Sequence, residues 1–147
     1  VAKLLPRAEV VIVTTPAVAA QKVAIRAVNM ARKSYLRVAG VIENMSDFTC
    51  EHGTAYALFG TGGGATLAAD AGIPLLGQVP LEPAVSAGGD AGEPIALGTG
   101  PAAEAFRTIA EHIVTEAVPP PEMAGCSARM LDAAVAALDE LDAKSLA

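Results

Sequence analysis

The chain has 147 residues, the size of one domain, and 52% of them are hydrophobic, so it can bury a core. Its net charge of −6 argues against a nucleic-acid surface, which needs clustered lysine and arginine. No apolar run reaches the ~18 residues of a membrane span, and no signal peptide is apparent. Two cysteines, Cys50 and Cys126, make no disulfide framework. We therefore expect a cytoplasmic protein with no membrane or nucleic-acid partner.

Strands and helices are predicted to alternate along the first part of the chain. An apolar run at 9–14, rich in valine and isoleucine, is typical of a strand buried on both faces. Thr15 and Pro16 fit the N-cap and first position of a helix that runs to about Lys33. Small apolar residues form its predicted inner face: Ala20, Ala24, Ala27, Val28 and Ala31. A basic stripe, interpreted as solvated, lies opposite: Lys22, Arg26, Asn29 and Lys33.

The middle of the chain contains two more strand patterns, at 37–43 and 74–79. Between them the sequence predicts a loop through Cys50 to about Gly60 and a short helix at 63–71 that ends at Gly72. The segment 80–100 holds five glycines and three prolines, and we expect it to be irregular.

The last part is predicted to be helical. An amphipathic helix at 101–117 should turn one apolar set inward and leave His112 solvated on its polar side. The inward set is Phe106, Ile109, Ala110, Ile113 and Ala117. We divide the chain into a domain at 1–117, a proline-rich linker at 118–126 and a C-terminal amphipathic segment at 127–147, with an acidic helix at about 127–142. The predicted fold class is α/β, a parallel sheet flanked by helices.

Open parallel sheets bind ligands beyond the carboxyl ends of their strands. Three predicted segments meet there: Thr14-Thr15, Glu43-Asn44-Met45 and Pro80-Leu81-Glu82. The Asn44 amide offers a donor and an acceptor to a base edge, but a local turn bond is an equal alternative.

The glycines Gly60 to Ala65, GTGGGA, match G-x-G-x-x-[GA], and Glu82 lies where a ribose-binding acid would stand. This pattern is that of a dinucleotide-binding oxidoreductase. However, the preceding AYALF is too short and alanine-rich for a buried strand. The favoured interpretation is a glycine-rich entry to a short helix. No Lys-Ser/Thr follows, so the glycines are no Walker A loop.

Cys50 and His52 offer one thiolate and one imidazole. A closed zinc or iron–sulfur site normally needs four ligands. Two chains across a two-fold axis could supply them in pairs. A loop cysteine without metal is the alternative.

Four blocks of the sequence, in order, resemble the Mrp/ApbC-type iron–sulfur cluster carrier ATPases of the deviant-Walker P-loop family. The blocks are VVIVTTPAVAAQKVAIRAVNMARK, GVIENMSDFTC, FGTGGGATLAADAGIPLLGQVPLEPAV and GGDAGEPI. The resemblance covers roughly residues 1–115 and includes the family's order and spacing.

The resemblance implies the C-terminal part of a P-loop NTPase-like domain that lacks its N-terminal half. It implies a homodimer that binds ATP with Mg²⁺, hydrolyses it, and passes a bridging [4Fe–4S] cluster to apo iron–sulfur proteins. Asn44 resembles the adenine-reading residue, and Pro80 to Glu82, with Pro80 and Glu82 as contacts, resemble the second adenine-side segment. Cys50 stands in the family's cluster-binding C-x-x-C, with His52 as a further candidate metal ligand.

Two departures from the family accompany this resemblance. Walker A and the Mg²⁺-binding segments are absent, so the chain contains no catalytic residue and cannot hydrolyse ATP by that mechanism. Because the chain begins with Val1, we expect that machinery to lie upstream. Gly53 replaces the second cysteine. This replacement motivates the alternative of a cluster-free nucleotide switch that acts as a scaffold or positioning ATPase.

Overall fold

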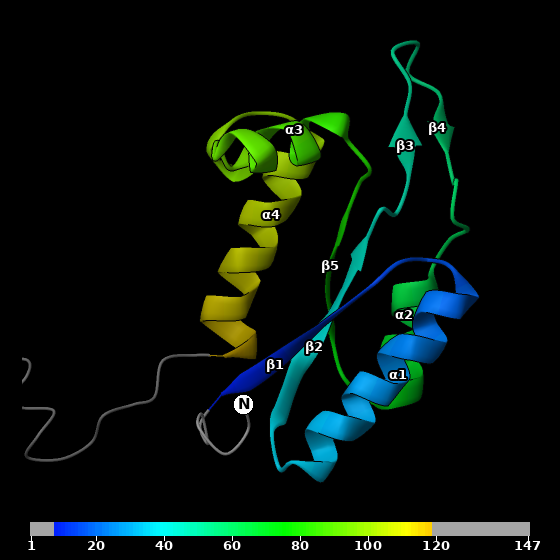
Figure 1. Cartoon of the computed structure of the whole chain (residues 1–147), viewed down its shortest axis with the longest axis vertical. Helices are drawn as coiled ribbons and strands as arrows, with labels where there is room; N and C mark the ends of the chain where they lie inside the picture. Colours follow the sequence, from blue (N-terminus) through cyan, green and yellow to red (C-terminus); the bar gives the residue numbers. More distant parts are fainter. Residues whose placement is uncertain (1–7, 119–147) are drawn as a thin grey trace, which may run out of the picture.

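The structure, a computed structural model, describes residues 8–118 of the chain. Its centre is a three-stranded parallel sheet of β1 (Glu9–Thr14), β2 (Arg37–Asn44) and β5 (Leu75–Val79), in the order β1-β2-β5 (Figure 1). All three agree with the predicted strands to within one residue, and the α/β class is confirmed. Within the described residues β1 pairs with β2 alone, so one of its edges is free.

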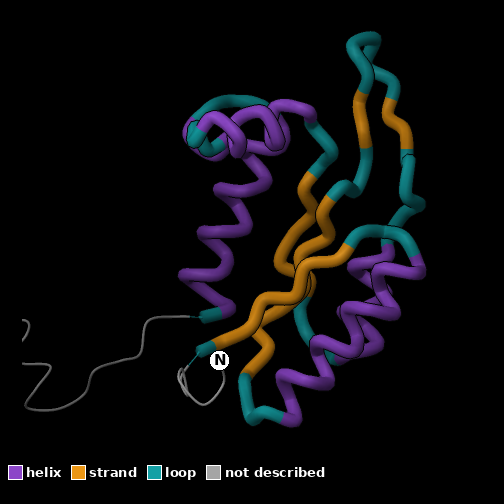
Figure 2. Tube along the Cα trace, in the orientation of Figure 1, coloured by secondary structure: helices purple, strands orange, loops and turns teal. Residues whose placement is uncertain are grey.

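Helices cover both faces of this sheet, as Figure 2 shows. On one face α1 (Val18–Lys33) and α2 (Gly63–Ala71) enclose a core of Ile12, Ala24, Val28, Val41, Leu67, Ala68 and Ala71. On the other face α4 (Pro101–His112) encloses a core of Ala39, Leu76, Val79, Ala102, Ile109 and Ala117. Alanine is frequent in both cores, which lets the helices lie close to the sheet.

The start of α1 differs from the prediction. Its N-cap is Ala17, without a side-chain cap, so the predicted cap at Thr15 and the helical position of Pro16 are wrong. The Pro16 carbonyl accepts a hydrogen bond of 2.9 Å from Nε2 of Gln21. This bond holds Pro16 in the turn that leaves the sheet, before the helix begins.

The rest of α1 follows the prediction. The helix ends at Lys33 and buries Ala24, Val28 and Ala31. The predicted basic stripe is exposed. The small inner face results from helical spacing of alanine and valine, which was visible in the sequence.

The predicted loop around Cys50 contains a hairpin instead. Strands β3 (Phe48–Thr49) and β4 (Ala55–Tyr56) pair antiparallel and form a sheet of their own. In Figure 1 this hairpin projects away from the central sheet. Strands of two residues are too short to show an alternating pattern in the sequence, which is why they were not predicted.

The segment 80–100, predicted to be irregular, contains α3 (Pro83–Ala91) and a 3₁₀ turn, η1 (Ile95–Leu97), so that prediction is wrong. Pro83 occupies the first turn, where proline is tolerated, and Gly92 ends the helix with φ of 74°. Gly88 and Gly89 lie inside the helix, where glycine normally indicates a break. No residue of α3 is buried.

The predicted helix at 101–117 is present as α4 followed by a π-helical turn, η2 (Ile113–Ala117). Three of the five predicted inward residues, Ile109, Ile113 and Ala117, pack in the core, so this part of the prediction is confirmed. Phe106, which is 36% exposed, and Ala110, which is exposed, do not. Phe106 instead lines a small pocket with Val85 of α3 and Ile95 of η1.

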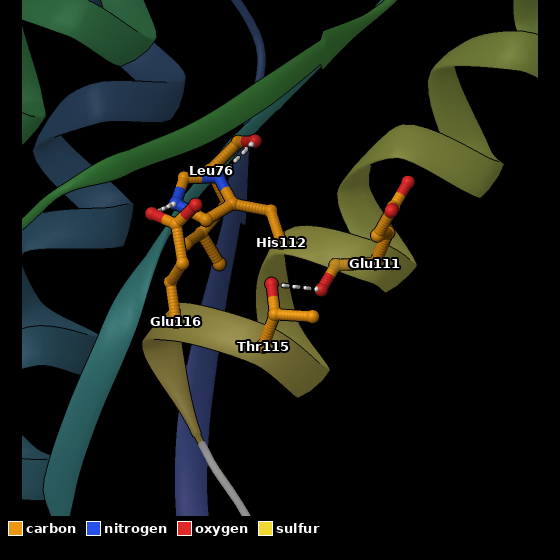
Figure 3. Close-up of polar contacts among 5 residues, drawn as sticks. All are labelled: Leu76, Glu111, His112, Thr115 and Glu116. Atoms are coloured by element: carbon orange, nitrogen blue, oxygen red, sulfur yellow. Dashed lines mark hydrogen bonds and ion pairs between the residues drawn. The ribbon is translucent and has the colours of Figure 1, made fainter.

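The prediction that His112 is solvated is also wrong. Its Nδ1 lies 3.2 Å from the Leu76 carbonyl oxygen, and its Nε2 lies 3.2 Å from Oε2 of Glu116 (Figure 3). The ring therefore joins the end of α4 to β5 of the central sheet.

The predicted linker at 118–126, apart from Val118, and the predicted segment at 127–147 lie outside the described residues, as does Cys126. Within residues 8–118, no helix has the length and apolar character needed to cross a membrane.

Candidate functional site

The carboxyl ends of the three parallel strands lie at one edge of the central sheet. β1 ends at Thr14, β2 at Asn44 and β5 at Val79. In the register Thr14 is opposite Glu43, and Asn44 is opposite Val79. Parallel strands therefore place the three ends side by side, where ligands of such sheets bind.

Two backbone hydrogen bonds connect the residues that follow β2 and β5. The N–H of Ser46 donates to the Val79 carbonyl at 3.1 Å, and the N–H of Leu81 donates to the Asp47 carbonyl at 2.7 Å. The segments around Asn44 and Pro80, which the sequence predicted to converge, are thus brought together.

Asn44 is half-buried, and its Oδ1 accepts a hydrogen bond of 2.9 Å from the N–H of Met45. The local turn bond, one of the two alternatives for this amide, is therefore present. It uses the side-chain oxygen and does not involve the Nδ2 group, which is the donor in contacts with a base. Asn44 also lines a cavity of about 560 Å³, together with Thr14, Thr15 and apolar residues of β1 and α1.

Glu82 is the N-cap residue of α3, and its carboxylate has a partner in another helix. Oε1 accepts a hydrogen bond of 2.9 Å from the N–H of Ala102, in the first turn of α4. A carboxylate at this position stabilises a helix through its free N–H groups and its dipole. The structure therefore gives Glu82 a capping role, and its contact with a nucleotide stays a prediction.

The glycines form the entry to a helix, as the favoured interpretation predicted, because α2 begins at Gly63. A dinucleotide fingerprint needs a strand of the parallel sheet directly before it, and residues 57–62 contain none. Close packing explains two of the glycines. A Cβ on Gly63 would collide with the Pro16 carbonyl, and one on Gly64 would lie 2.6 Å from Cβ of Glu43.

Glu43 is a site residue for which the sequence predicted no role of its own. It is fully buried at the end of β2. Its Oε2 accepts a hydrogen bond of 2.5 Å from the N–H of Gly64, and its Oε1 accepts one of 2.5 Å from Nε2 of Gln78. One signal in the sequence could have identified it, since a carboxylate within a buried strand requires hydrogen-bond partners.

Cys50 lies half-buried at the tip of the β3–β4 hairpin. Its N–H donates to the Thr54 carbonyl at 3.0 Å, and the N–H of Gly53 donates to the Cys50 carbonyl at 2.9 Å. Hydrogen bonds from the backbone of His52 and then of Thr54 lower the pKa of the Cys50 thiol, because they stabilise the thiolate. The tight turn therefore favours the form that binds metals.

His52 shares this turn with Cys50 and is exposed. Within residues 8–118, no group of three or more His, Cys, Asp and Glu is placed to hold a metal ion. One described chain thus provides two donors of the types that iron–sulfur sites use, and it does not close a site alone. Gly53, where the resemblance expects a cysteine, has φ of +79°, a backbone conformation that suits glycine.

The chain is similar in sequence to known proteins over its first 114 residues. A family model described as ParA, NUBPL iron-transfer P-loop NTPase, matches residues 1–114. An iron-sulfur cluster carrier protein of Mycobacterium tuberculosis is 47% identical over 105 residues, covering 67% of this chain and 28% of the relative. A cytosolic Fe-S cluster assembly factor Nubp1 homolog of Drosophila pseudoobscura is 40% identical over 108 residues, covering 71% of this chain and 35% of the relative. The chain therefore spans about a third of the length of these relatives.

The fold has relatives among solved structures. The MinD cell division protein of Aquifex aeolicus superimposes with a TM-score of 0.58 at 22% identity, covering 79% of this chain and 48% of that one. At this identity the likeness concerns the fold, which is that of P-loop NTPases. The predicted P-loop NTPase-like fold is confirmed.

Proposed function

Because this chain belongs to the ParA family of NUBPL-type iron-transfer P-loop NTPases, we propose that it forms part of an iron–sulfur cluster carrier. The names of its relatives support this function. The structural observation that carries the proposal is Cys50, held at a projecting hairpin tip with a lowered thiol pKa. A thiolate at such a tip can bind iron and still be reached by a recipient protein.

ATP with Mg²⁺ is the nucleotide that we propose for the intact protein. Asn44 would read the adenine edge, and Pro80 and Glu82 would lie beside the base. Backbone hydrogen bonds that join the segments after β2 and β5 support this arrangement. This chain has no Gly-Lys-Ser/Thr sequence, so ATP hydrolysis would need residues outside it, and the chain alone would be inactive.

A second copy of the chain is the proposed partner at the hairpin. Two copies would bring two Cys50 thiolates and two His52 imidazoles to one two-fold axis, enough donors for a bridging [4Fe–4S] cluster. The apolar side chains beside the hairpin support an interface, since Tyr56, Leu58 and Phe59 are 48%, 58% and 43% exposed. Apo iron–sulfur proteins would receive the cluster, and the cytosolic relative supports a cytoplasmic location.

Anaerobic reconstitution of the intact protein with iron and sulfide tests the carrier function. We expect a sulfur-to-iron charge-transfer band that Cys50→Ala abolishes, because the thiolate is the proposed ligand. Cys126→Ala is the matched control, and it should keep the band. No band in the wild-type protein, or an equal band in Cys50→Ala, would contradict the proposal.

A second candidate function is favoured by Gly53. With one cysteine in the hairpin turn of each chain, the protein could be a nucleotide switch without a cluster, acting as a scaffold or positioning ATPase. Iron content after anaerobic purification distinguishes the two functions. Stoichiometric iron excludes the scaffold, whereas ATP binding without iron supports it.

A further inference from the structure

Residues 45–62 leave the central sheet after β2 and return to it at the start of α2, and this excursion carries Cys50. We propose that Glu43 is a positioning residue that holds the two ends of this excursion together and so fixes where the hairpin stands. The inference rests on the proposed carrier function, in which the place of Cys50 matters.

The two oxygens of Glu43 serve two different elements. Oε2 accepts from the N–H of Gly64 in α2, where the excursion returns, and Oε1 accepts from Nε2 of Gln78 in β5. Glu43 itself precedes the excursion by two positions in β2. One buried carboxylate therefore connects the outgoing end, the returning end and the neighbouring strand.

Burial makes this connection specific. Glu43 has no exposed surface, so each lost hydrogen bond would leave a polar group away from water. The returning end packs closely here, because a Cβ on Gly64 would lie 2.6 Å from Cβ of Glu43 and one on Gly63 would collide with the Pro16 carbonyl oxygen. Glu43 thus forms part of the surface against which the start of α2 packs.

The outgoing end of the excursion is joined to the segment at the end of β5 by two backbone hydrogen bonds, from Ser46 to Val79 and from Leu81 to Asp47. Since these bonds do not reach α2, they cannot fix the returning end. Between Tyr56 and Gly63, backbone hydrogen bonding is sparse, with Gly60 donating to the Ala57 carbonyl at 3.2 Å. The Gly64 bond to Glu43 is therefore the hydrogen bond that joins the first turn of α2 to the end of β2, beside the apolar packing of α2 on the sheet.

A role in core packing alone does not explain a glutamate here. Glu43 is a fully buried charged residue in a strand whose other buried residues are apolar or glycine. A valine or leucine would fill the same strand position without any desolvated carboxylate. What an apolar residue could not do is accept hydrogen bonds from α2 and β5 at once.

Hydrogen exchange in the intact, metal-free protein tests the role of Glu43. In Glu43→Ala we expect the amides of Cys50 and Gly53 to exchange at least about tenfold faster, while those of Val28 and Val41 in the core keep their protection. Glu43→Gln preserves the size of the side chain and one acceptor, so it should accelerate exchange of the same amides to a smaller extent. It takes the place of Glu43→Ala if that variant does not fold. Glu104→Gln, a carboxylate on the exposed side of α4, is the control.

Limited proteolysis of the same proteins, with the cleavage sites identified by peptide mass spectrometry, is a second readout. In the Glu43 variants cleavage within residues 45–62 should accelerate relative to cleavage elsewhere, because the returning end of the excursion has lost its hydrogen bond to β2. Unchanged hairpin amides and cleavage rates, or equal acceleration of all amides, would overturn the proposal. Neither readout involves a cluster, so failure of the carrier function would be recognised separately.

Discussion

Glu43 and Glu82 each accept a hydrogen bond from the first turn of a helix, at two different ends of strands of the central sheet. Glu43 is the next-to-last residue of β2, and Glu82 follows β5. Each accepts a hydrogen bond from the second residue of a helix that begins about twenty positions later, at Gly64 and Ala102 respectively. Both helices have glycine as N-cap, Gly62 and Gly100, which has no side chain for capping. Each glutamate supplies from a neighbouring element the acceptor that the glycine lacks.

Asn44 allows a prediction at the same scale. In the intact protein Asn44→Ala should weaken ATP binding by about 1–3 kcal/mol, because buried hydrogen bonds to the base would be lost. Isothermal titration calorimetry measures this change. Asn29→Ala, on the exposed side of α1, is the control and should leave the affinity unchanged. Equal affinities for the wild-type protein and Asn44→Ala would contradict the adenine-reading role.

At the scale of helices and strands, the sequence predicts some elements correctly and misses others. The strands β1, β2 and β5 and the helix α1 were predicted, because long apolar runs and helical spacing follow directly from burial. α3 was missed because Gly88 and Gly89 interrupt its pattern, and the hairpin because its strands have two residues each. The bond between Glu43 and Gly64 could not be predicted for a different reason. Only the tertiary fold brings these two positions, 21 residues apart, into contact.

The cap on α4 gives a prediction at the scale of an element. Glu82→Ala should lower the free energy of unfolding by about 1 kcal/mol, because the Ala102 N–H loses its acceptor. Urea denaturation without nucleotide measures this loss. Glu93→Ala, an exposed carboxylate outside any helix, should change stability less. Equal stabilities of the two variants would show that Glu82 does not cap α4.

At the scale of the molecule, the candidate site divides into the strand ends, where we propose that a nucleotide binds, and the hairpin that carries Cys50. The sequence correctly predicted that Asn44 and Pro80 lie together, since both follow strands of one parallel sheet. It could not indicate how Cys50 is presented, because the hairpin depends on short-range bonds and on a left-handed Gly53. The resemblance identified the family, which residue patterns alone left open.

The proposed homodimer gives the prediction at this scale. Tyr56→Ser combined with Phe59→Ser should raise the dimer dissociation constant of the intact protein at least about tenfold, because two apolar side chains leave the interface. Sedimentation equilibrium measures this constant. Tyr35→Ser, which replaces a side chain that is 97% exposed on another segment, is the control. If the double variant and the control dimerise equally, the interface lies elsewhere.

The free edge of β1 has a consequence for strand addition. Alternate residues of the segment EVVIVT direct their N–H and C=O groups to that side, where they are unpaired within the described residues, and Val13 is 58% exposed. Such β-branched segments of low charge are templates for aggregation when nothing covers them. In the part of the chain that the structure describes, this edge is therefore the position at which a further strand, or β1 of a second copy, would add.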